Sequence, residues 1–359
     1  MRIASLFSAC VMILATNIQT HVCKQMVPAI FIFGDSLVDV GNNNYLPLSI
    51  AKANYPHHGI DFVTHNATGR FSNGMNAADA LCTKLGISFP PAYLSIPEGK
   101  ASLYLAGVNF ASSGAGIFNN SDQALAQSIP LSRQVKYFEK VYDALVEREG
   151  RKPTRDLISK SLFFIVMGSN DLFDYTNYVD VKTKYSPEDY TDLMESNMKR
   201  HVTTLHELGA KRFSFVGVGK IGCAPARRLK SVLGQCEDSM NSIGEMYNGK
   251  LTLLLAELKS DHERFNYSYF NAHVGMQNML ENPSKYGFAE VTEACCGIGK
   301  FNAELPCSPV SLCCPNRKDH MFWDLFHPSE AAYLAFADEI FDGPTTITFP
   351  YNVRQLVTD

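Results

Sequence analysis

The strongest constraint on the fold is an alternation of short apolar runs with longer amphipathic stretches. Four runs rich in β-branched and aromatic residues have the composition of buried strands, at 29–33, 162–167, 212–218 and 265–270. Strands that alternate with helices predict a parallel sheet with both faces covered. No internal repeat, low-complexity tract or long linker divides the 359 residues. After an N-terminal leader we therefore predict one α/β domain, residues 24–359.

Two of the intervening stretches have clear helical periodicity. In the first, Ser186 has the character of an N-cap, Pro187 that of a first-turn residue and Gly209 that of a helix end. Apolar residues recur at helical spacing in both stretches, at positions 194, 198, 202, 205 and 208 and at positions 243, 247, 251, 254 and 258. These stripes predict helix faces that pack on the core, not cofactor-binding segments.

Composition excludes several classes of protein. Hydrophobic residues make up 46% of the chain and charged residues 19%, which excludes a disordered protein. The 32 Lys and Arg residues oppose 36 Asp and Glu residues, a net charge of −4. No run of five like charges exists, so nucleic acid is not a predicted partner. Beyond the N-terminus no run of apolar residues is long enough to span a bilayer, and we expect no transmembrane anchor.

The N-terminal segment has the features of a secretory signal peptide. Arg2 supplies a positive start, and the apolar stretch 6–15 is too short to cross a bilayer. No clean small-residue cleavage site stands out, and we place cleavage between Thr20 and Lys24, which makes 1–23 the signal. The alternative is a buried N-terminal helix. The mature protein is expected to be soluble and outside the cell.

In a secreted protein, three tripeptides of the sequence become candidate glycosylation sites. Asn66, Asn119 and Asn266 each begin an acceptor sequence for N-glycosylation. Such tripeptides also occur by chance, so each is weak alone, and we expect at least one to be occupied.

The cysteines point to the same compartment. Ten cysteines are more than a typical cytosolic enzyme carries. Cys223 and Cys236 lie 13 residues apart, and five more crowd near the C-terminus, at 295, 296, 307, 313 and 314. Zinc is the alternative for this cluster, but the C-x₂-C spacing of most zinc ribbons is missing and an oxidising compartment favours disulfides. We predict disulfides and no metal site; spacing leaves the connectivity open, and Cys82 either pairs or stays a buried thiol.

Polar residues follow the predicted strands, where α/β sheets place their functional loops. Ser36 comes just after the first run, within Gly34-Asp35-Ser36-Leu37, and Asn170 follows the second run. Each also fits an ordinary turn, because Ser is a common helix cap and Asn a common turn residue. The serine motif is not the G-x-S-x-G elbow, since Val38 stands where that motif has its second glycine.

Two further segments carry candidate chemistry. Small residues at 109–116 let backbone N–H groups approach a ligand closely. Asp324 and His327 stand three residues apart, which lets the carboxylate hydrogen-bond the imidazole. None of the nine other histidines combines an acidic neighbour with a comparable apolar setting.

One glycine-rich motif matches a nucleotide-binding pattern but lacks the context that such a site needs. Residues 217–222 match the dinucleotide-binding fingerprint and follow a predicted strand. However, Cys223, Ala224 and Pro225 come next, and no helix begins there to receive a pyrophosphate. We therefore predict no nicotinamide cofactor.

Taken together, these motifs resemble those of the GDSL esterase/lipase family of the SGNH hydrolase superfamily. The elements are Gly-Asp-Ser-Leu at 34–37, Gly-x-Asn-Asp at 168–171, the small-residue loop at 109–117 and Asp-x-x-His at 324–327. The likeness is closest to the plant branch of the family, whose further blocks resemble Thr68–Gly74 and Ala294–Gly297. It extends from about Ala29 to Phe341, and Cys313 looks like an addition to the pattern.

The resemblance implies a fold and a set of roles. The fold is a flavodoxin-like three-layer α/β/α sandwich with a mainly parallel central sheet. Ser36 would be the nucleophile, His327 the general base and then acid, and Asp324 the group that orients the imidazole. The oxyanion hole would consist of the backbone N–H groups of Ser36 and Gly114 and the side-chain amide of Asn170. No metal or organic cofactor is required.

The implied activity is hydrolysis of carboxylic esters of lipids, acylated small molecules or polysaccharides, in the cell wall or apoplast. Acyl transfer to an alcohol through the same acyl-enzyme is one alternative. A secreted glycoprotein that binds a ligand without cleaving it is another alternative. An inactive site, however, has no physical need for the four polar residues at positions 36, 170, 324 and 327. The acyl chain, the alcohol and the oligomeric state stay open.

Overall fold

The computed structural model describes residues 25–121 and 123–358. The predicted signal peptide, 1–23, lies outside the described residues. The core is a six-stranded sheet in the order β10-β5-β4-β3-β1-β2. Its strands are β1 (Ile30–Gly34), β2 (Gly107–Asn109), β3 (Leu162–Val166), β4 (Arg212–Val216), β5 (Asn266–Phe270) and β10 (Thr348–Pro350).

The sheet is parallel except at one edge, where β10 runs antiparallel to β5. The chain passes from β1 outward to β2 and then back to β3 on the other side of β1. Strand order therefore reverses between β1 and β3, and α/β sheets bind ligands at the carboxyl ends of the strands beside such a reversal.

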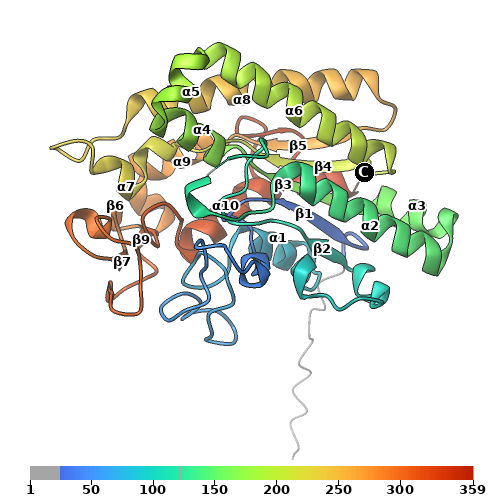
Figure 1. Ribbon diagram of the computed structural model, residues 1–359, viewed down its shortest axis with the longest axis horizontal. Coiled ribbons are helices and arrows are strands. Elements are labelled where there is room, and N and C mark those ends of the chain that lie inside the picture. Colours follow the sequence, from blue (N-terminus) through green and yellow to red (C-terminus); the bar gives the residue numbers. More distant parts are fainter. Residues whose placement is uncertain (1–24, 122, 359) are drawn as a thin grey trace, which may run out of the picture.

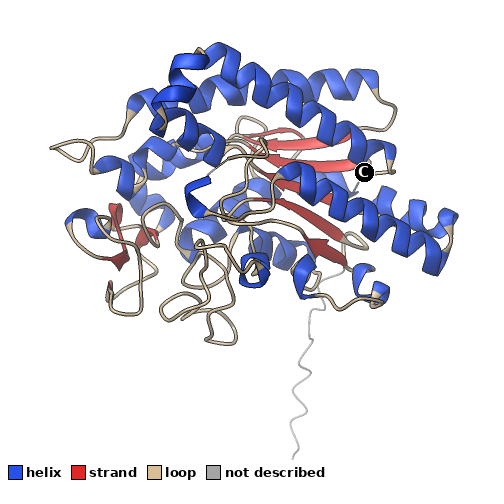
Figure 2. Ribbon diagram, in the orientation of Figure 1, coloured by secondary structure: helices blue, strands red, loops and turns tan. Residues whose placement is uncertain are grey.

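Helices cover both faces of the sheet (Figures 1 and 2). The helices α2 (Leu131–Glu149), α6 (Pro187–Glu207) and α8 (Asp238–Asp261) pack on one face and share a core with Phe31 and Phe33. On the other face, α1 (Ala77–Leu85), α10 (Glu330–Asp342) and α11 (Val353–Thr358) share a core with Ile30 and Ile32. This alternation along β1 follows from the two-residue period of a strand. The predicted three-layer α/β/α sandwich is confirmed.

Shorter elements complete the fold, and most of them follow the carboxyl ends of the strands. They are α3 (Arg151–Lys160), α4 (Ser169–Asn177), α5 (Val179–Lys184), α7 (Pro225–Arg228) and α9 (Ala272–Glu281), and two small sheets that pair β6 (Glu290–Ala294) with β9 (His320–Phe322) and β7 (Cys296–Gly297) with β8 (Leu312–Cys313). Among the described residues, no helix has both the length and the apolarity to cross a membrane.

The predicted elements form with small shifts at their ends. The four predicted strands become β1, β3, β4 and β5, and α6 begins after Ser186, whose hydroxyl accepts the Asp189 N–H. Two edge strands escaped prediction. The strand β2 has three residues and ends at Asn109, where the segment assigned to a small-residue loop begins, and β10 carries Pro350, a residue that suits only an edge.

The predicted disulfides are present, with a connectivity that spacing left open. Cys223 bonds Cys236, Cys295 bonds Cys314, and Cys296 bonds Cys307. In the described part of the chain, Cys82 and Cys313 stay as thiols. Cys82 lies buried on α1, as a small apolar residue would.

The three predicted glycosylation acceptors lie in different surroundings. Asn66 and Asn119 are exposed, whereas Asn266 is half-buried at the start of β5. Their occupancy remains a prediction.

Candidate active site

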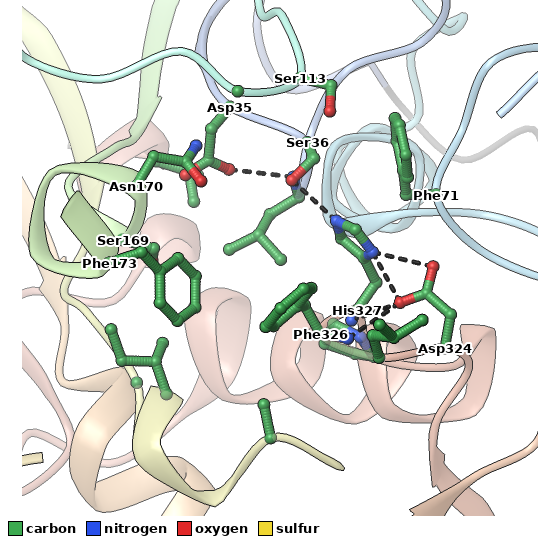
Figure 3. A pocket seen from close by; sticks show the side chains of 18 of the residues that line it. Asp35, Ser36, Phe71, Ser113, Ser169, Asn170, Phe173, Asp324, Phe326 and His327 are labelled. Carbon is green, nitrogen blue, oxygen red and sulfur yellow. Dashed lines mark hydrogen bonds and ion pairs between the residues drawn. The ribbon is translucent and has the colours of Figure 1, made fainter. Parts of the chain in front are cut away.

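Loops at the carboxyl end of the sheet bring together residues that are far apart in the sequence. Ser36 lies in the turn after β1, Asn170 in the first turn of α4 after β3, and His327 in the loop between β9 and α10. The Ser36 Oγ lies 2.8 Å from the His327 Nε2. The other ring nitrogen, Nδ1, lies 2.8 and 2.9 Å from the two carboxylate oxygens of Asp324. Figure 3 shows this line of contacts.

The turn that carries Ser36 is held by its neighbours. A Cβ on Gly34 would stand 2.3 Å from the Val38 side chain and 2.6 Å from the Val166 carbonyl, so only glycine fits. The Gln134 side chain accepts the Gly34 N–H at 2.9 Å and donates to the Gly34 carbonyl at 2.8 Å. Asp35 Oδ1 accepts the Leu37 N–H at 3.0 Å, which closes the turn around Ser36.

The carboxylate of Asp324 is fixed and stays ionised. Its Oδ1 accepts the backbone N–H groups of Phe326 and His327 at 3.0 and 2.9 Å. Burial raises the pKa of this carboxyl, but the facing His327 ring and the hydrogen bonds outweigh that effect, and the pKa lies below its ordinary value. A fixed anion at Nδ1 keeps the proton on that nitrogen and leaves Nε2 free to accept one.

A second layer of residues holds the His327 ring and its loop. The Phe71 ring lies against the His327 ring, with 4.7 Å between the centroids. Asn73, two residues on, accepts the Glu330 N–H at 2.8 Å, and the Glu330 carboxylate accepts the Met75 N–H at 2.8 Å. The stretch 68–75 is thereby tied to the start of α10, directly after His327.

A second histidine stands behind the acid. Burial lowers the pKa of His58 to about 4, so its ring is neutral. Its Nδ1 accepts the indole N–H of Trp323 at 3.1 Å, and Trp323 directly precedes Asp324. The sequence did not single out His58, because its acidic neighbour, Asp324, is remote in the sequence and comes close only in the folded protein. No local sequence signal marks this histidine.

Three groups could receive a negative charge next to Ser36. The N–H groups of Ser36 and Gly114 donate to no other described group. The Asn170 side chain donates one N–H to the Ala115 carbonyl at 2.8 Å, which fixes the amide and leaves its second N–H available. Gly114 has φ 77°, a conformation that favours glycine, and a Cβ there would meet Leu125 at 2.9 Å.

A buried acid shapes the small-residue loop. Asp39 accepts the N–H groups of Gly41 and Asn42 at 2.7 and 2.8 Å and that of Ser113 at 3.1 Å. Burial raises the pKa of Asp39 to about 6 against the effect of these hydrogen bonds. Asp39 thus places Ser113, and with it Gly114, beside the Ser36 turn.

Ser36, Asn170 and His327 line a cavity of about 570 Å³. This volume lies within the range of small-molecule sites. The wall is mostly apolar, and it includes Ile50, Phe71 and Leu125 and also Phe270, Phe336 and Ile340. No cluster of three potential metal ligands occurs among the described residues.

The family described as GDSL-like Lipase/Acylhydrolase matches residues 30–340. The chain belongs to this family. A GDSL esterase/lipase of Arabidopsis thaliana is 45% identical over 340 residues, which cover 92% of this chain and 90% of that protein. A second Arabidopsis GDSL esterase/lipase is 34% identical over 356 residues, with 96% and 91% covered.

Among solved structures, a catalytic mutant of Axe2, an acetylxylan esterase from Geobacillus stearothermophilus, aligns with a TM-score of 0.39 and 13% identity over 86% of this chain and 90% of that one. This likeness is too low to bear on the reaction. Membership of the GDSL-like family and the identity to the plant relatives make the chain a hydrolase of ester bonds.

Proposed function

We propose that this protein is a secreted serine esterase or lipase that hydrolyses carboxylic esters of lipids, acylated small molecules or polysaccharides. The supporting observation is the unbroken line of hydrogen bonds from Asp324 through His327 to Ser36, at the wall of an apolar cavity. Such a line is what a serine hydroxyl needs, because the hydroxyl is a weak nucleophile until a base takes its proton.

In the first half of the proposed reaction, Ser36 Oγ attacks the ester carbonyl while His327 Nε2 takes its proton. The imidazolium then gives this proton to the departing alcohol, and the acyl group stays on Ser36. Asp324 stabilises the imidazolium and holds the ring in the tautomer that leaves Nε2 free. In the second half, His327 Nε2 takes a proton from a water molecule that attacks the acyl carbonyl. The imidazolium then returns this proton to Ser36 Oγ as the carboxylic acid leaves.

The negative charge of the tetrahedral intermediate would be met by the N–H groups of Ser36 and Gly114 and the Asn170 amide. Each is fixed before the substrate arrives: Gly114 by its loop, and Asn170 by its hydrogen bond to Ala115. Fixed donors need no reorganisation during the reaction, which is why this kind of stabilisation is large.

The cavity and the cysteines support the remaining parts of the proposal. An apolar wall favours the hydrocarbon part of an ester over a hydrated sugar or a charged group. Three disulfides support an extracellular location, since the cytosol keeps thiols reduced.

The test is hydrolysis of p-nitrophenyl butyrate and octanoate by purified wild type, Ser36→Ala and Ser242→Ala. Ser242 is an exposed serine on α8, outside the cavity, and its variant should match wild type. Ser36→Ala should lose turnover by about 10⁶-fold with its melting temperature kept. A Ser36→Ala protein that retains more than about a hundredth of the wild-type rate would refute the assignment of the nucleophile.

A further inference from the structure

Five cysteines gather beside the candidate active site, and one of them keeps its thiol. Four of the five form the two disulfides of the cluster, and the fifth, Cys313, packs against them as a half-buried thiol. The cluster adjoins the site because the Cys296 N–H donates to the Trp323 carbonyl at 2.8 Å, and Trp323 directly precedes Asp324. Ester cleavage as proposed above assigns no role to this thiol.

The thiol lies directly opposite a cysteine that is already bonded. In the small sheet, Cys313 of β8 pairs with Cys296 of β7. The neighbouring hydrogen bond, from the Cys314 N–H to the Cys295 carbonyl at 2.7 Å, makes this a non-hydrogen-bonded pair of the antiparallel ladder. Side chains of such a pair point to the same face, and their Cα atoms are about 4.5 Å apart. That separation lies within the range of disulfides, about 4.4 to 6.8 Å.

Cys296 therefore has two partners within reach. Its present partner, Cys307, is 11 residues away, and Cys313 is 17 residues away. The entropy of loop closure grows slowly with length, so the two loops differ little in cost. In the exchange, the Cys313 thiolate attacks the Cys296 sulfur and bonds it, and Cys307 leaves as a thiolate that takes up a proton. One disulfide breaks and one forms, so no oxidant or reductant is needed.

The exchange matters for the site because Cys307 belongs to the cavity wall. Pro306, Cys307 and Tyr55 line the cavity, and the Cys307 carbonyl accepts the Tyr55 hydroxyl at 3.1 Å. The disulfide to Cys296 fastens this stretch of wall to β7. A bond from Cys296 to Cys313 instead joins two strands that are already paired, and it leaves the wall with one covalent tie fewer.

We propose that Cys296 exchanges its disulfide partner between Cys307 and Cys313, and that this exchange fastens or releases the cavity wall at Cys307. In one isomer the wall is held and Cys313 is the thiol. In the other the wall is released and Cys307 is the thiol. The inference goes beyond the proposed ester hydrolysis, and its main readout, the position of the thiol, requires no activity.

The surroundings of Cys313 show how the exchange can be stopped for analysis. Only a thiolate attacks a disulfide. Burial raises the pKa of the Cys313 thiol, while the nearby Arg317 lowers it and Asp61 raises it. Arg317 and Asp61 also form an ion pair with each other at 2.6 Å. At pH 4 the thiol therefore carries its proton, and the distribution between the two isomers is frozen.

Mapping of the free thiols tests the exchange. Protein that begins at residue 25 is kept at pH 8 without reductant, brought to pH 4, and then denatured at pH 6 in excess N-ethylmaleimide. After reduction and labelling of the released thiols with iodoacetamide, fragment ions locate the maleimide on Cys307 or Cys313. Cys313→Ser, which offers Cys296 no second partner, gives the background. Cys82→Ser, which removes a buried thiol on α1, is the matched control.

Wild type and Cys82→Ser should carry the maleimide on Cys313 in some molecules and on Cys307 in others. More maleimide should leave this distribution unchanged, because the isomers exist before denaturation. Cys313→Ser should show no label on Cys307. A wild-type label on Cys307 that does not exceed this background, or that disappears as the maleimide concentration rises, would overturn the exchange.

Cys307→Ser tests the second pairing by itself. After exposure to oxidised glutathione, this variant should contain one thiol, on Cys82, because Cys296 and Cys313 bond each other. Three thiols, or glutathione bound to Cys296 or Cys313, would overturn the pairing. Thiol counting by mass works on denatured protein, and the wild-type map carries the test if this variant does not fold.

The released wall should show in substrate binding. On p-nitrophenyl octanoate, oxidised Cys307→Ser should have a higher KM than Cys313→Ser, whose wall stays fastened, with a smaller change in kcat. Equal KM values would overturn the release of the wall. Absence of ester cleavage in wild type would count against the proposed function and would leave the thiol map as it stands.

Discussion

Replacement of Asp35 by Asn should change how the stability of the protein depends on pH. The side chain is buried, and its partners are the Leu37 N–H and, more distantly, the charges of His327 and Asp171. Burial is the largest influence and raises the pKa of Asp35 from 3.8 to about 7, against the Leu37 N–H and His327, which lower it. In the unfolded chain the carboxyl returns to its ordinary value.

The sign follows from proton binding. Between pH 3.8 and about 7 the folded protein holds a proton on Asp35 that the unfolded chain releases. The stability contributed by the protonated form is complete below the lower value and is lost as pH rises to the higher one. A difference of about 3 units, at about 1.4 kcal/mol per unit, corresponds to about 4 kcal/mol. An asparagine has no proton to lose and removes this dependence.

The assay is urea unfolding of wild type and Asp35→Asn at pH 4, 5.5, 7 and 8.5. The difference in unfolding free energy should move in favour of the variant by about 4 kcal/mol from the lowest pH to the highest. Asp39, whose pKa burial also raises, is present in both proteins, and its own titration cancels. Asp143→Asn, at an exposed position of α2, serves as control and should show no such trend. A difference that stays constant within about 1 kcal/mol across this range would refute the reasoning.

Four further predictions concern the site and its frame. Asn170→Ala should lower kcat by about 10²–10³ with little change in KM, because it removes one of three oxyanion donors; a change mainly in KM, measured on p-nitrophenyl octanoate, would contradict this role. Asp324→Asn should lower kcat by about 10⁴, since it removes the charge and the acceptor that set the tautomer, and an effect below about tenfold would contradict its role. Thiol titration of denatured, unreduced protein that begins at residue 25 should find two thiols against eight after reduction, as three disulfides and two free cysteines require. Reduction should lower the free energy of unfolding by about 2–5 kcal/mol per bridge, and unchanged urea unfolding after reduction would count against the disulfides as a structural frame.

Much of this protein can be predicted from local patterns in its sequence. The runs that became β1, β3, β4 and β5 are long and apolar enough to be recognised, and the cap at Ser186 is a short-range signal. Ser36 and Asn170 could be nominated because each directly follows a strand, and the carboxyl ends of parallel strands meet at one edge. The contact between Asp324 and His327 could also be predicted locally, because the two residues lie only three positions apart.

Other features depended on the path of the chain. The disulfide pairs, the place of the short edge strands β2 and β10, and the role of Phe71 against the His327 ring have no local signature. His58 and Tyr333 illustrate the point: each is a common residue type in an ordinary stretch of sequence, and burial beside Asp324 sets its pKa far from the usual value.

The features that the sequence predicts and those that it does not predict differ for a physical reason. Helical periodicity, caps and turns arise from contacts within a few residues, which a sequence displays directly. The 2.8 Å contact between Ser36 and His327 joins residues 291 positions apart, and it exists because β1 and the loop before α10 end at the same edge of the sheet. Burial and electrostatic environment are properties of that assembly, so only the tertiary structure decides them.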